Sequence, residues 1–241
     1  MASWIVHLRI AENLLRRIPG LEAGPFAVGN IAPDSGIPDE KWEHFNPPPW
    51  VTHFGVEGSL MHTLADLEFY RRYLQPLREK GALGLVSFRL GYFFHLITDN
   101  LWAIEIGHPT QERWKEQFAA DKEFIWEVKK DWYGLDFCYV RDHPDCLYWR
   151  VFLTVQAETG GLEFLPLEAV RQRVAYIQEY YQCTDERVRE LVSRPYVYLS
   201  RARADRFVTE ASRRVYRIYK QYWVHGSSPD GFASALDSPM D

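Results

Sequence analysis

The chain has 241 residues, which is long enough for one large domain with a sizeable buried core. Apolar residues make up 46% of it and charged residues 25%, a balance that is typical of globular proteins and excludes an intrinsically disordered chain. The net charge of −5 excludes a strongly cationic nucleic-acid-binding protein, and the sequence carries no strong nucleic-acid signature.

Three features predict where the protein resides. No apolar run reaches the roughly eighteen residues that a membrane-spanning helix needs. The first residues lack a basic region followed by a long apolar core, so we expect no signal peptide. Cys138, Cys146 and Cys183 fit neither a disulfide framework nor a zinc site, so we expect reduced thiols. Together these features predict a cytoplasmic protein with no transmembrane segment.

The N-terminal part of the chain divides into a helix and a long segment rich in helix breakers. Apolar residues at helical spacing predict a helix over about 3–17, which Pro19 and Gly20 end. Over about 24–58, glycine and proline recur so often that no regular structure is obvious. So long an irregular segment is uncommon in a compact domain unless it has a function. It is therefore the first place to look for a site.

The rest of the chain is predicted to be helical. We expect helices at about 60–80, 83–106, 110–132, 144–155, 167–182, 185–192 and 196–223. No pair of strands is convincing, so the predicted fold class is all-α, a multi-helix single domain. This domain would cover residues 1–225, and a flexible C-terminal tail rich in Ser, Pro and Gly would follow at 226–241.

The most apolar predicted helix contains the strongest chemical signal. His95 and Asp99 are four residues apart, which places both side chains on one face of that helix. An ionised aspartate is almost never buried unless it is paired or bound to a cation. The pair has two interpretations, a structural hydrogen bond or part of a metal site, and alone it favours the structural one.

Three further residues shift that balance toward a metal site. Asp34 lies in a turn-rich segment that can expose a carboxylate, His53 follows three prolines, and His7 lies on the first predicted helix. Taken singly, each has an ordinary interpretation: a turn-forming aspartate, a loop histidine bonded to backbone, and a histidine on a helix face. Their order is more informative, because a histidine, a loop aspartate and a loop histidine precede His-x-x-x-Asp on a buried helix.

The ordered set resembles the zinc-dependent phospholipase C family, whose relatives include the P1-type nucleases and the N-terminal domain of glycosylphosphatidylinositol-specific phospholipase D. The matching pieces are Trp4-Ile5-Val6-His7-Leu8-Arg9-Ile10, Pro33-Asp34, Thr52-His53-Phe54 and the helix from Gly91 to Trp102, which span about the first half of the chain. The resemblance implies a helical fold of the phospholipase C/P1 nuclease type. It also implies that one zinc ion lies among Asp34, His53, His95 and Asp99. His7 would hold a second ion, with Asp99 bridging the two.

Other histidines compete with these for the role of ligand. His44 could replace His53 as the loop ligand, and we favour His53 because its Thr-His-Phe context is the one that resembles the family. His62 and Asp66 form a second His-x-x-x-Asp pair. Their predicted helix is more polar, so we expect a solvated pair there rather than two ligands.

The sequence departs from this family in two ways. Secreted members begin at a tryptophan whose free amino group binds metal, whereas three residues precede Trp4 here. Members with three metal ions also carry a further histidine after the His-x-x-x-Asp motif and then a His-x-x-x-Glu or His-x-x-x-Asp pair, and we find none of these in register. Additional metal ligands or substrate contacts could come from Glu127, Asp131, Asp136 and Arg89, with Arg89 facing the substrate phosphate.

These residues predict a metal-dependent hydrolase of phosphoric esters, which the resemblance makes a phosphodiesterase similar to zinc-dependent phospholipase C. One or two Zn²⁺ ions would polarise the phosphoryl oxygens and acidify a bound water. Asp34 would be the catalytic residue that orients this water or accepts its proton. The ligands also suit Mn²⁺ or Fe²⁺. The substrate would be a phosphoester, either a phospholipid or a nucleotide, and the oligomeric state is not predicted.

Two alternative functions stay open at this point. In a degenerate, non-catalytic relative, the metal site would have become structural. An HD-type phosphohydrolase would use similar ligands on another helical scaffold, but it normally places His directly before Asp. The chain contains only the reverse order, at Asp142-His143.

Overall fold

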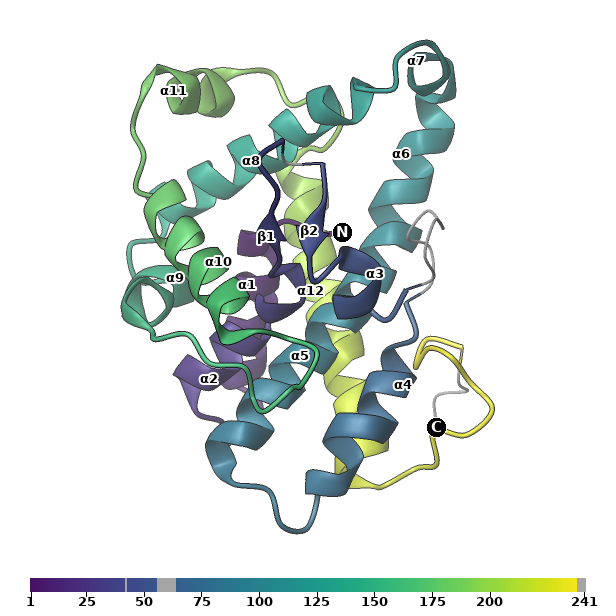
Figure 1. The fold of residues 1–241 in the computed structure, drawn as a ribbon. Helices are drawn as coiled ribbons and strands as arrows, with labels where there is room; N and C mark the ends of the chain where they lie inside the picture. Colours follow the sequence, from purple (N-terminus) through teal and green to yellow (C-terminus); the bar gives the residue numbers. More distant parts are fainter. Residues whose placement is uncertain (42, 56–63, 238–241) are drawn as a thin grey trace.

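Helices make up most of the structure, a computed structural model that describes residues 1–41, 43–55 and 64–237 (Figure 1). The N-terminal part contains α1 (Trp4–Leu15), α2 (Ala23–Gly29), the 3-10 turn η1 (Ala32–Asp34), β1 (Ile37–Pro38), β2 (Phe45–Asn46) and α3 (Pro49–Thr52). Then come α4 (Asp66–Phe69), η2 (Tyr70–Leu74), η3 (Gln75–Leu77), α5 (Leu83–Trp102), η4 (Ala103–Gly107), α6 (His108–Arg113), α7 (Lys115–Ala120) and α8 (Phe124–Asp142). The last part contains α9 (Leu147–Arg150), η5 (Phe152–Thr154), α10 (Leu167–Tyr180), α11 (Glu186–Ser193), α12 (Arg201–Ile218) and η6 (Tyr219–Val224). The predicted all-α fold class is confirmed.

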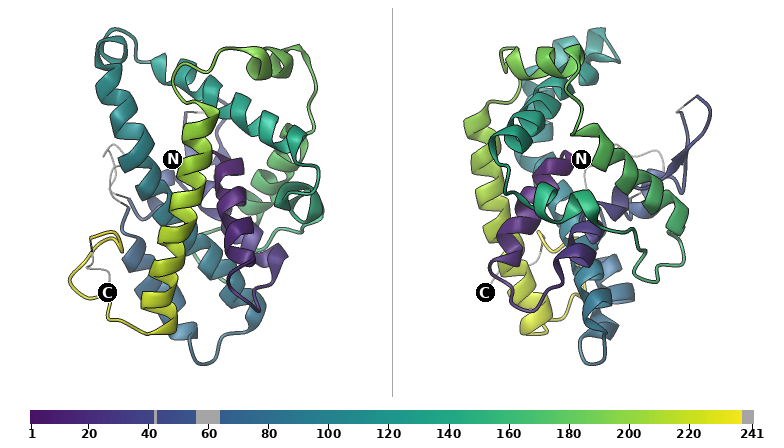
Figure 2. Two further views of the ribbon diagram at one scale, coloured as in Figure 1. Left: turned by 180° about the vertical axis from the view of Figure 1, so that it is seen from behind. Right: turned by 90° about the vertical axis from the view of Figure 1, so that its left-hand side faces the viewer.

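The helix α5 is the centre of the core. Every residue from Leu90 to Trp102 is buried, and the helix contacts α1, α2, α4 and α12. Figure 2 shows α12 running along one side of the molecule beside α1. Among the described residues, no helix is both long and apolar enough to cross a membrane.

Two glycines allow α2 and α5 to touch at the backbone. A Cβ atom at Gly29 would lie 2.0 Å from the carbonyl oxygen of Phe88, and one at Gly91 would lie 2.4 Å from that of Phe26. Real Cβ atoms do not approach so closely, so neither position accepts a side chain without displacing a helix. This contact fixes the end of α2, and with it Asn30, against α5.

The breaker-rich segment contains more regular structure than the sequence predicts. It holds α2, η1 and α3, and the expectation of no strand pair is wrong because Ile37 pairs with Asn46 and Pro38 with Phe45 in an antiparallel ladder. Each strand has only two residues. Strands so short carry no period-2 pattern, so sequence periodicity cannot find them.

The expected helix at 110–132 is interrupted, and helix continues well beyond it. Trp114 and Asp121 leave helical geometry, which divides the segment into α6, α7 and α8. The Asp121 carboxylate accepts a hydrogen bond from the backbone N–H of Glu123 at 2.8 Å, an Asx-type turn just before α8. The predicted helix at 60–80 begins in residues outside those described, and its described part starts at Asp66.

Part of the C-terminal segment packs against the domain through a buried carboxylate. Asp66 is fully buried and accepts hydrogen bonds from the Ser234 hydroxyl, the Ala235 backbone N–H and the Asn100 amide. Ser234 and Ala235 are buried as well. Asp66 thus joins the segment after Gly226, expected to be a loose tail, to α5 and α4.

We predict that Gly91→Ala destabilises the fold by about 1–3 kcal/mol, because the new methyl group must push α2 away from α5. The measurement is the free energy of unfolding in urea. Gly107→Ala is the control, since its Cβ would meet only the Trp102 carbonyl oxygen, at an ordinary 3.7 Å. Equal losses in the two variants would contradict the close α2–α5 contact.

Asp66 also predicts a pH dependence of stability. Burial, opposed by its three hydrogen-bond donors, raises its pKa to about 7. The folded protein therefore binds more protons than the unfolded chain between about pH 4 and 7, so this group lowers the unfolding free energy as pH rises through that window. The slope is at most about 1.4 kcal/mol per pH unit and vanishes above pH 7.

Asp66→Asn should remove this part of the slope, whatever its effect on absolute stability. Urea unfolding at pH 5, 6, 7 and 8 measures it, with the exposed Asp230→Asn as the control. A slope unchanged in Asp66→Asn would show that the carboxylate ionises as readily in the folded protein as in the unfolded chain.

Candidate metal centre

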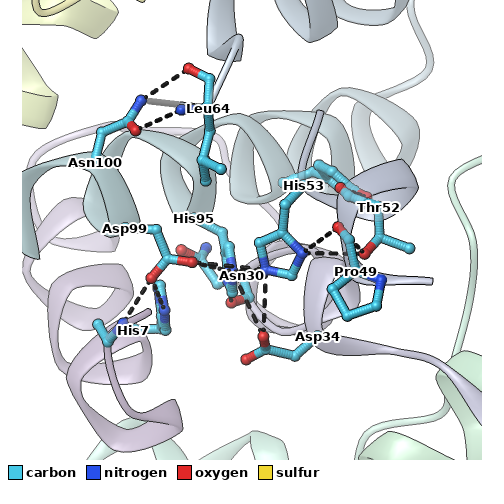
Figure 3. Close-up of polar contacts among 12 residues, drawn as sticks. His7, Asn30, Asp34, Pro49, Thr52, His53, Leu64, His95, Asp99 and Asn100 are labelled. Atoms are coloured by element: carbon cyan, nitrogen blue, oxygen red, sulfur yellow. Dashed lines mark hydrogen bonds and ion pairs between the residues drawn. The ribbon is translucent and has the colours of Figure 1, made fainter. Parts of the chain in front are cut away.

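Four segments bring five chemically active side chains to one place (Figure 3). His7 comes from the first turn of α1, Asp34 from the end of η1, and His53 from the residue that ends α3. His95 and Asp99 come from successive turns of α5. All are buried except Asp34, whose side chain is 9% exposed. The structure thus gathers the five residues that the family resemblance implies as metal ligands.

The polar atoms of this cluster lie within reach of a shared ion. His53 Nε2 is 3.3 Å from Asp34 Oδ1 and 3.6 Å from Asp99 Oδ2. His95 Nε2 is 3.3 Å from Asp99 Oδ2, and His7 Nε2 is 3.3 Å from Asp99 Oδ1. Asp99 therefore faces three imidazoles, as a bridging ligand would.

Backbone carbonyls fix the orientation of two of the rings. His95 Nδ1 donates to the Asn30 carbonyl at 2.8 Å, and His53 Nδ1 lies 3.1 Å from the Pro49 carbonyl. A carbonyl oxygen only accepts, so a ring that hydrogen-bonds to it carries the hydrogen on Nδ1, and in its neutral form such a ring presents a lone pair at Nε2. The Thr52 hydroxyl lies 3.0 Å from His53 Nδ1 as well. The two Nε2 atoms are 3.3 Å apart. Two lone pairs that face each other repel unless a proton or a metal ion lies between them.

Several buried atoms of the cluster lack a hydrogen-bond partner among the described residues. They are both ring nitrogens of His7 and Oδ2 of Asp99. The rings of His7 and His95 also stack with centroids 3.8 Å apart. A buried polar atom without a partner costs about 1–3 kcal/mol. Three such atoms in one cluster therefore indicate a binding partner that the protein side chains do not supply.

The charge state of the cluster suits a divalent cation. Burial, together with the neighbouring His95, lowers the pKa of His7 to about 4, so this ring is neutral at pH 7. Burial alone would raise the pKa of both aspartates, but His95 lowers that of Asp99 and His53 lowers that of Asp34 well below the usual range. Two ionised carboxylates balance one divalent ion, which makes its burial less costly.

The donor atoms fall into two overlapping groups. His7, His95 and Asp99 form one, and Asp34, His53 and His95 form the other, with the donor atoms of each group within 4.8 Å of one another. Imidazole nitrogen and carboxylate oxygen are the usual zinc ligands of sites without cysteine. The residues present therefore fit zinc.

The start of the chain lies against the cluster. The backbone N–H of Ala2 donates to Asp99 Oδ1 at 2.7 Å, and the Ser3 hydroxyl donates to Asp136 at 2.8 Å. Trp4 instead lies among the aromatic rings of Tyr176 and its neighbours on α10. The residue that contacts Asp99 is thus Ala2 and not Trp4.

The additional candidate residues lie outside both ligand groups. Asp131 accepts hydrogen bonds from the backbone of Tyr198 and Leu199, and Asp136 accepts from Ser3 and Tyr181.

Two of these candidates have their polar atoms engaged elsewhere. Glu127 pairs with Lys130 and Arg194 on the surface side of α8. Arg89 donates to the carbonyls of Tyr73 in η2 and of Gly160, so its guanidinium joins η2 to the loop before α10 instead of pointing into the cluster.

The competing histidines are not in the cluster either. The His44 side chain is 80% exposed and pairs with Asp39 in the β1–β2 connection. His62 lies outside the described residues. Its predicted partner Asp66 is not solvated as expected, because it is fully buried in the hydrogen bonds that hold Ser234 and Ala235.

A pocket with a volume of about 240 Å³ leads from the surface to Asp34 and His53. Lys129 and Trp132 from α8 and Arg173 from α10 line it, and the sequence indicates none of them. They belong to no motif and lie far along the chain from the metal-ligand candidates. Only the packing of α8 and α10 over the N-terminal segments brings them to the cluster.

A comparison with protein families agrees with this geometry. The family model described as zinc-dependent phospholipase C matches residues 6–148, which is more than half of the chain and includes all five clustered residues. No match was found among curated proteins or among solved structures.

We predict that His53→Ala loses most of the zinc that the wild-type protein retains, because the variant lacks the Nε2 atom that lies between Asp34, His95 and Asp99. Each protein is loaded with zinc and desalted, and its metal content is measured by elemental analysis. His44→Ala is the matched control, since that histidine is exposed and should leave the content unchanged. Similar zinc content in all three proteins would contradict a metal site at His53.

Proposed function

The chain belongs to the zinc-dependent phospholipase C family, and from this premise we propose that it is a zinc-dependent phosphodiesterase. The observation that carries the proposal is the close approach of the His53 and His95 Nε2 atoms, 3.3 Å apart and flanked by two carboxylates. A proton or a metal ion between the two nitrogens makes this arrangement favourable, and the two flanking carboxylates suit a divalent ion. We propose His7, Asp34, His53, His95 and Asp99 as the ligands of one or two zinc ions.

Access to the cluster supports a catalytic role. When bound, a divalent ion supplies Lewis-acid polarisation of a phosphoryl oxygen and lowers the pKa of a nearby water. Asp34 and His53 line the pocket, whereas Asp99, His7 and His95 lie beneath them. A phosphoester in the pocket would therefore meet Asp34 first.

Asp34 is suited to handle the proton of the attacking water. The neighbouring His53 and His95 outweigh the effect of burial and hold the pKa of its carboxyl below the usual range. It is also the acidic side chain of the pocket lining. We propose that Asp34 orients the water and accepts its proton beside His53, whose Nε2 lies 3.3 Å from Asp34 Oδ1.

The two alternatives receive less support. A purely structural ion needs no access from solvent, yet the cluster opens into a pocket large enough for a phosphoryl group. An HD-type phosphohydrolase would belong to another family. Phospholipids and nucleotides are both phosphodiester sources that the pocket chemistry admits.

We expect the zinc-loaded protein to hydrolyse bis(p-nitrophenyl) phosphate, to lose this activity with a chelator and to regain it with zinc. Asp34→Asn should lower kcat by about 100-fold, the usual contribution of a general base. Asp39→Asn is the control, because Asp39 is an exposed aspartate that pairs with His44. A protein that retains zinc but releases no nitrophenol would instead contain a structural ion.

A further inference from the structure

The pocket above the cluster is lined by positively charged side chains, apart from the proposed metal ligand Asp34. Among the described residues that line it, the charged side chains are Asp34, Lys129 and Arg173. Asp34 faces His53 and belongs to the cluster. The charges left for a ligand are therefore two cations.

Lys129 has no acidic partner of its own. It lies partly buried on α8 with Nζ 4.6 Å from the centre of the Trp126 ring, and it makes no ion pair with any carboxylate of the described residues. Burial lowers its pKa, and the charge of Asp34 opposes that effect. The next residue, Lys130, pairs with Glu127 outside this pocket. A cation that is desolvated without a counter-ion indicates that an anion completes its surroundings.

Two other donors of the pocket also lack partners. The Nε1 atom of Trp132, a residue only 7% exposed, has no hydrogen-bond partner among the described residues, and the same is true of Nε of Arg173. The indole, guanidinium and ammonium groups can only donate hydrogen bonds. The unpaired groups of these lining residues are therefore donors, which anionic oxygens can accept from.

Two aromatic faces of the pocket lining, those of Trp4 and Trp126, are already covered by the chain's own cations. Arg173 lies over the Trp4 ring at 5.4 Å, and Lys129 lies over the Trp126 ring at 4.6 Å. Quaternary ammonium ligands bind to such faces when the faces are free. At Trp4 and Trp126 an ammonium group would have to displace a like charge.

We propose that this pocket selects phosphoesters whose organic substituent is neutral or anionic and rejects those whose substituent carries an ammonium group. Lys129 is the specificity residue, holding an oxygen of the phosphoryl group or of the substituent, and Arg173 excludes positive charge from the Trp4 side. The proposal rests on the proposed function for the position of the phosphate but concerns binding rather than turnover.

The test compares two ligands of the same shape and different charge. Phosphorylcholine carries a trimethylammonium group, and 3,3-dimethylbutyl phosphate has carbon in place of that nitrogen. Calorimetry measures the Kd of each for the zinc-loaded and the metal-free protein. We expect about tenfold tighter binding of the neutral ligand, the scale of one like-charge contact at a partly exposed site.

Variants of two neighbouring lysines identify the source of the preference. Lys129→Met should reduce the preference and Lys129→Glu should abolish or reverse it, whereas Lys130→Met should leave it unchanged. Zinc content and the midpoint of thermal unfolding, measured for each variant, separate loss of selectivity from loss of the fold. Because Lys129 is partly exposed, at least the Met variant should fold.

The outcomes distinguish this proposal from the proposed function. Equal affinity for the two ligands, tighter binding of phosphorylcholine, or no binding of either ligand by either form of the protein would overturn the selectivity. A preference that Lys129→Glu leaves intact would overturn the role of Lys129. A zinc-loaded protein that prefers the neutral ligand but hydrolyses no phosphodiester would overturn the proposed function and leave the selectivity standing.

Discussion

The hydrogen bond from His95 Nδ1 to the Asn30 carbonyl is the interaction on which the candidate centre depends. It fixes the ring so that Nε2 points at His53 and Asp99. It exists only because α2 ends against α5, and that contact requires two positions without side chains, Gly29 and Gly91. The chemistry of the cluster thus follows from a packing constraint, since the closest helix contact in the core also sets the orientation of a metal-ligand candidate.

The sequence predicts this cluster well because its members carry local signals. His95 and Asp99 share a face through their helical spacing, and their surroundings are so apolar that an ionised aspartate there needs a partner. Asp34 and His53 are identifiable as candidate ligands because they lie in a long glycine- and proline-rich segment, which is uncommon in a compact domain unless it has a function. Spacing cannot show, however, that two imidazoles turn the same nitrogen toward each other. That depends on the Asn30 and Pro49 carbonyls, which any residue could supply.

Other features escape sequence analysis for different physical reasons. The strands β1 and β2 are too short to have a period, and the turn at Asp121 depends on one side chain bonding to one backbone amide. The sequence predicts that Asp66 forms a solvated pair with His62, yet Asp66 accepts hydrogen bonds from Ser234 and Ala235, near the other end of the chain. Lys129 likewise has no motif around it, and only the packing of α8 over the cluster places it in the pocket. For Asp66 and for Lys129 the decisive neighbours are distant in sequence and carry no motif.

The charges of the centre and of the pocket complement each other. One divalent ion would be neutralised by the ionised Asp34 and Asp99, because His7 is neutral at pH 7. A second ion near His7 would leave an excess of positive charge, and Lys129 and Arg173 increase it at the pocket. Within a partly desolvated site such an excess is costly unless an anion offsets it. A phosphoryl group with neutral or anionic substituents offsets the excess positive charge, whereas an ammonium substituent would add positive charge again. The number of ions held and the charge of the preferred substrate are therefore physically linked.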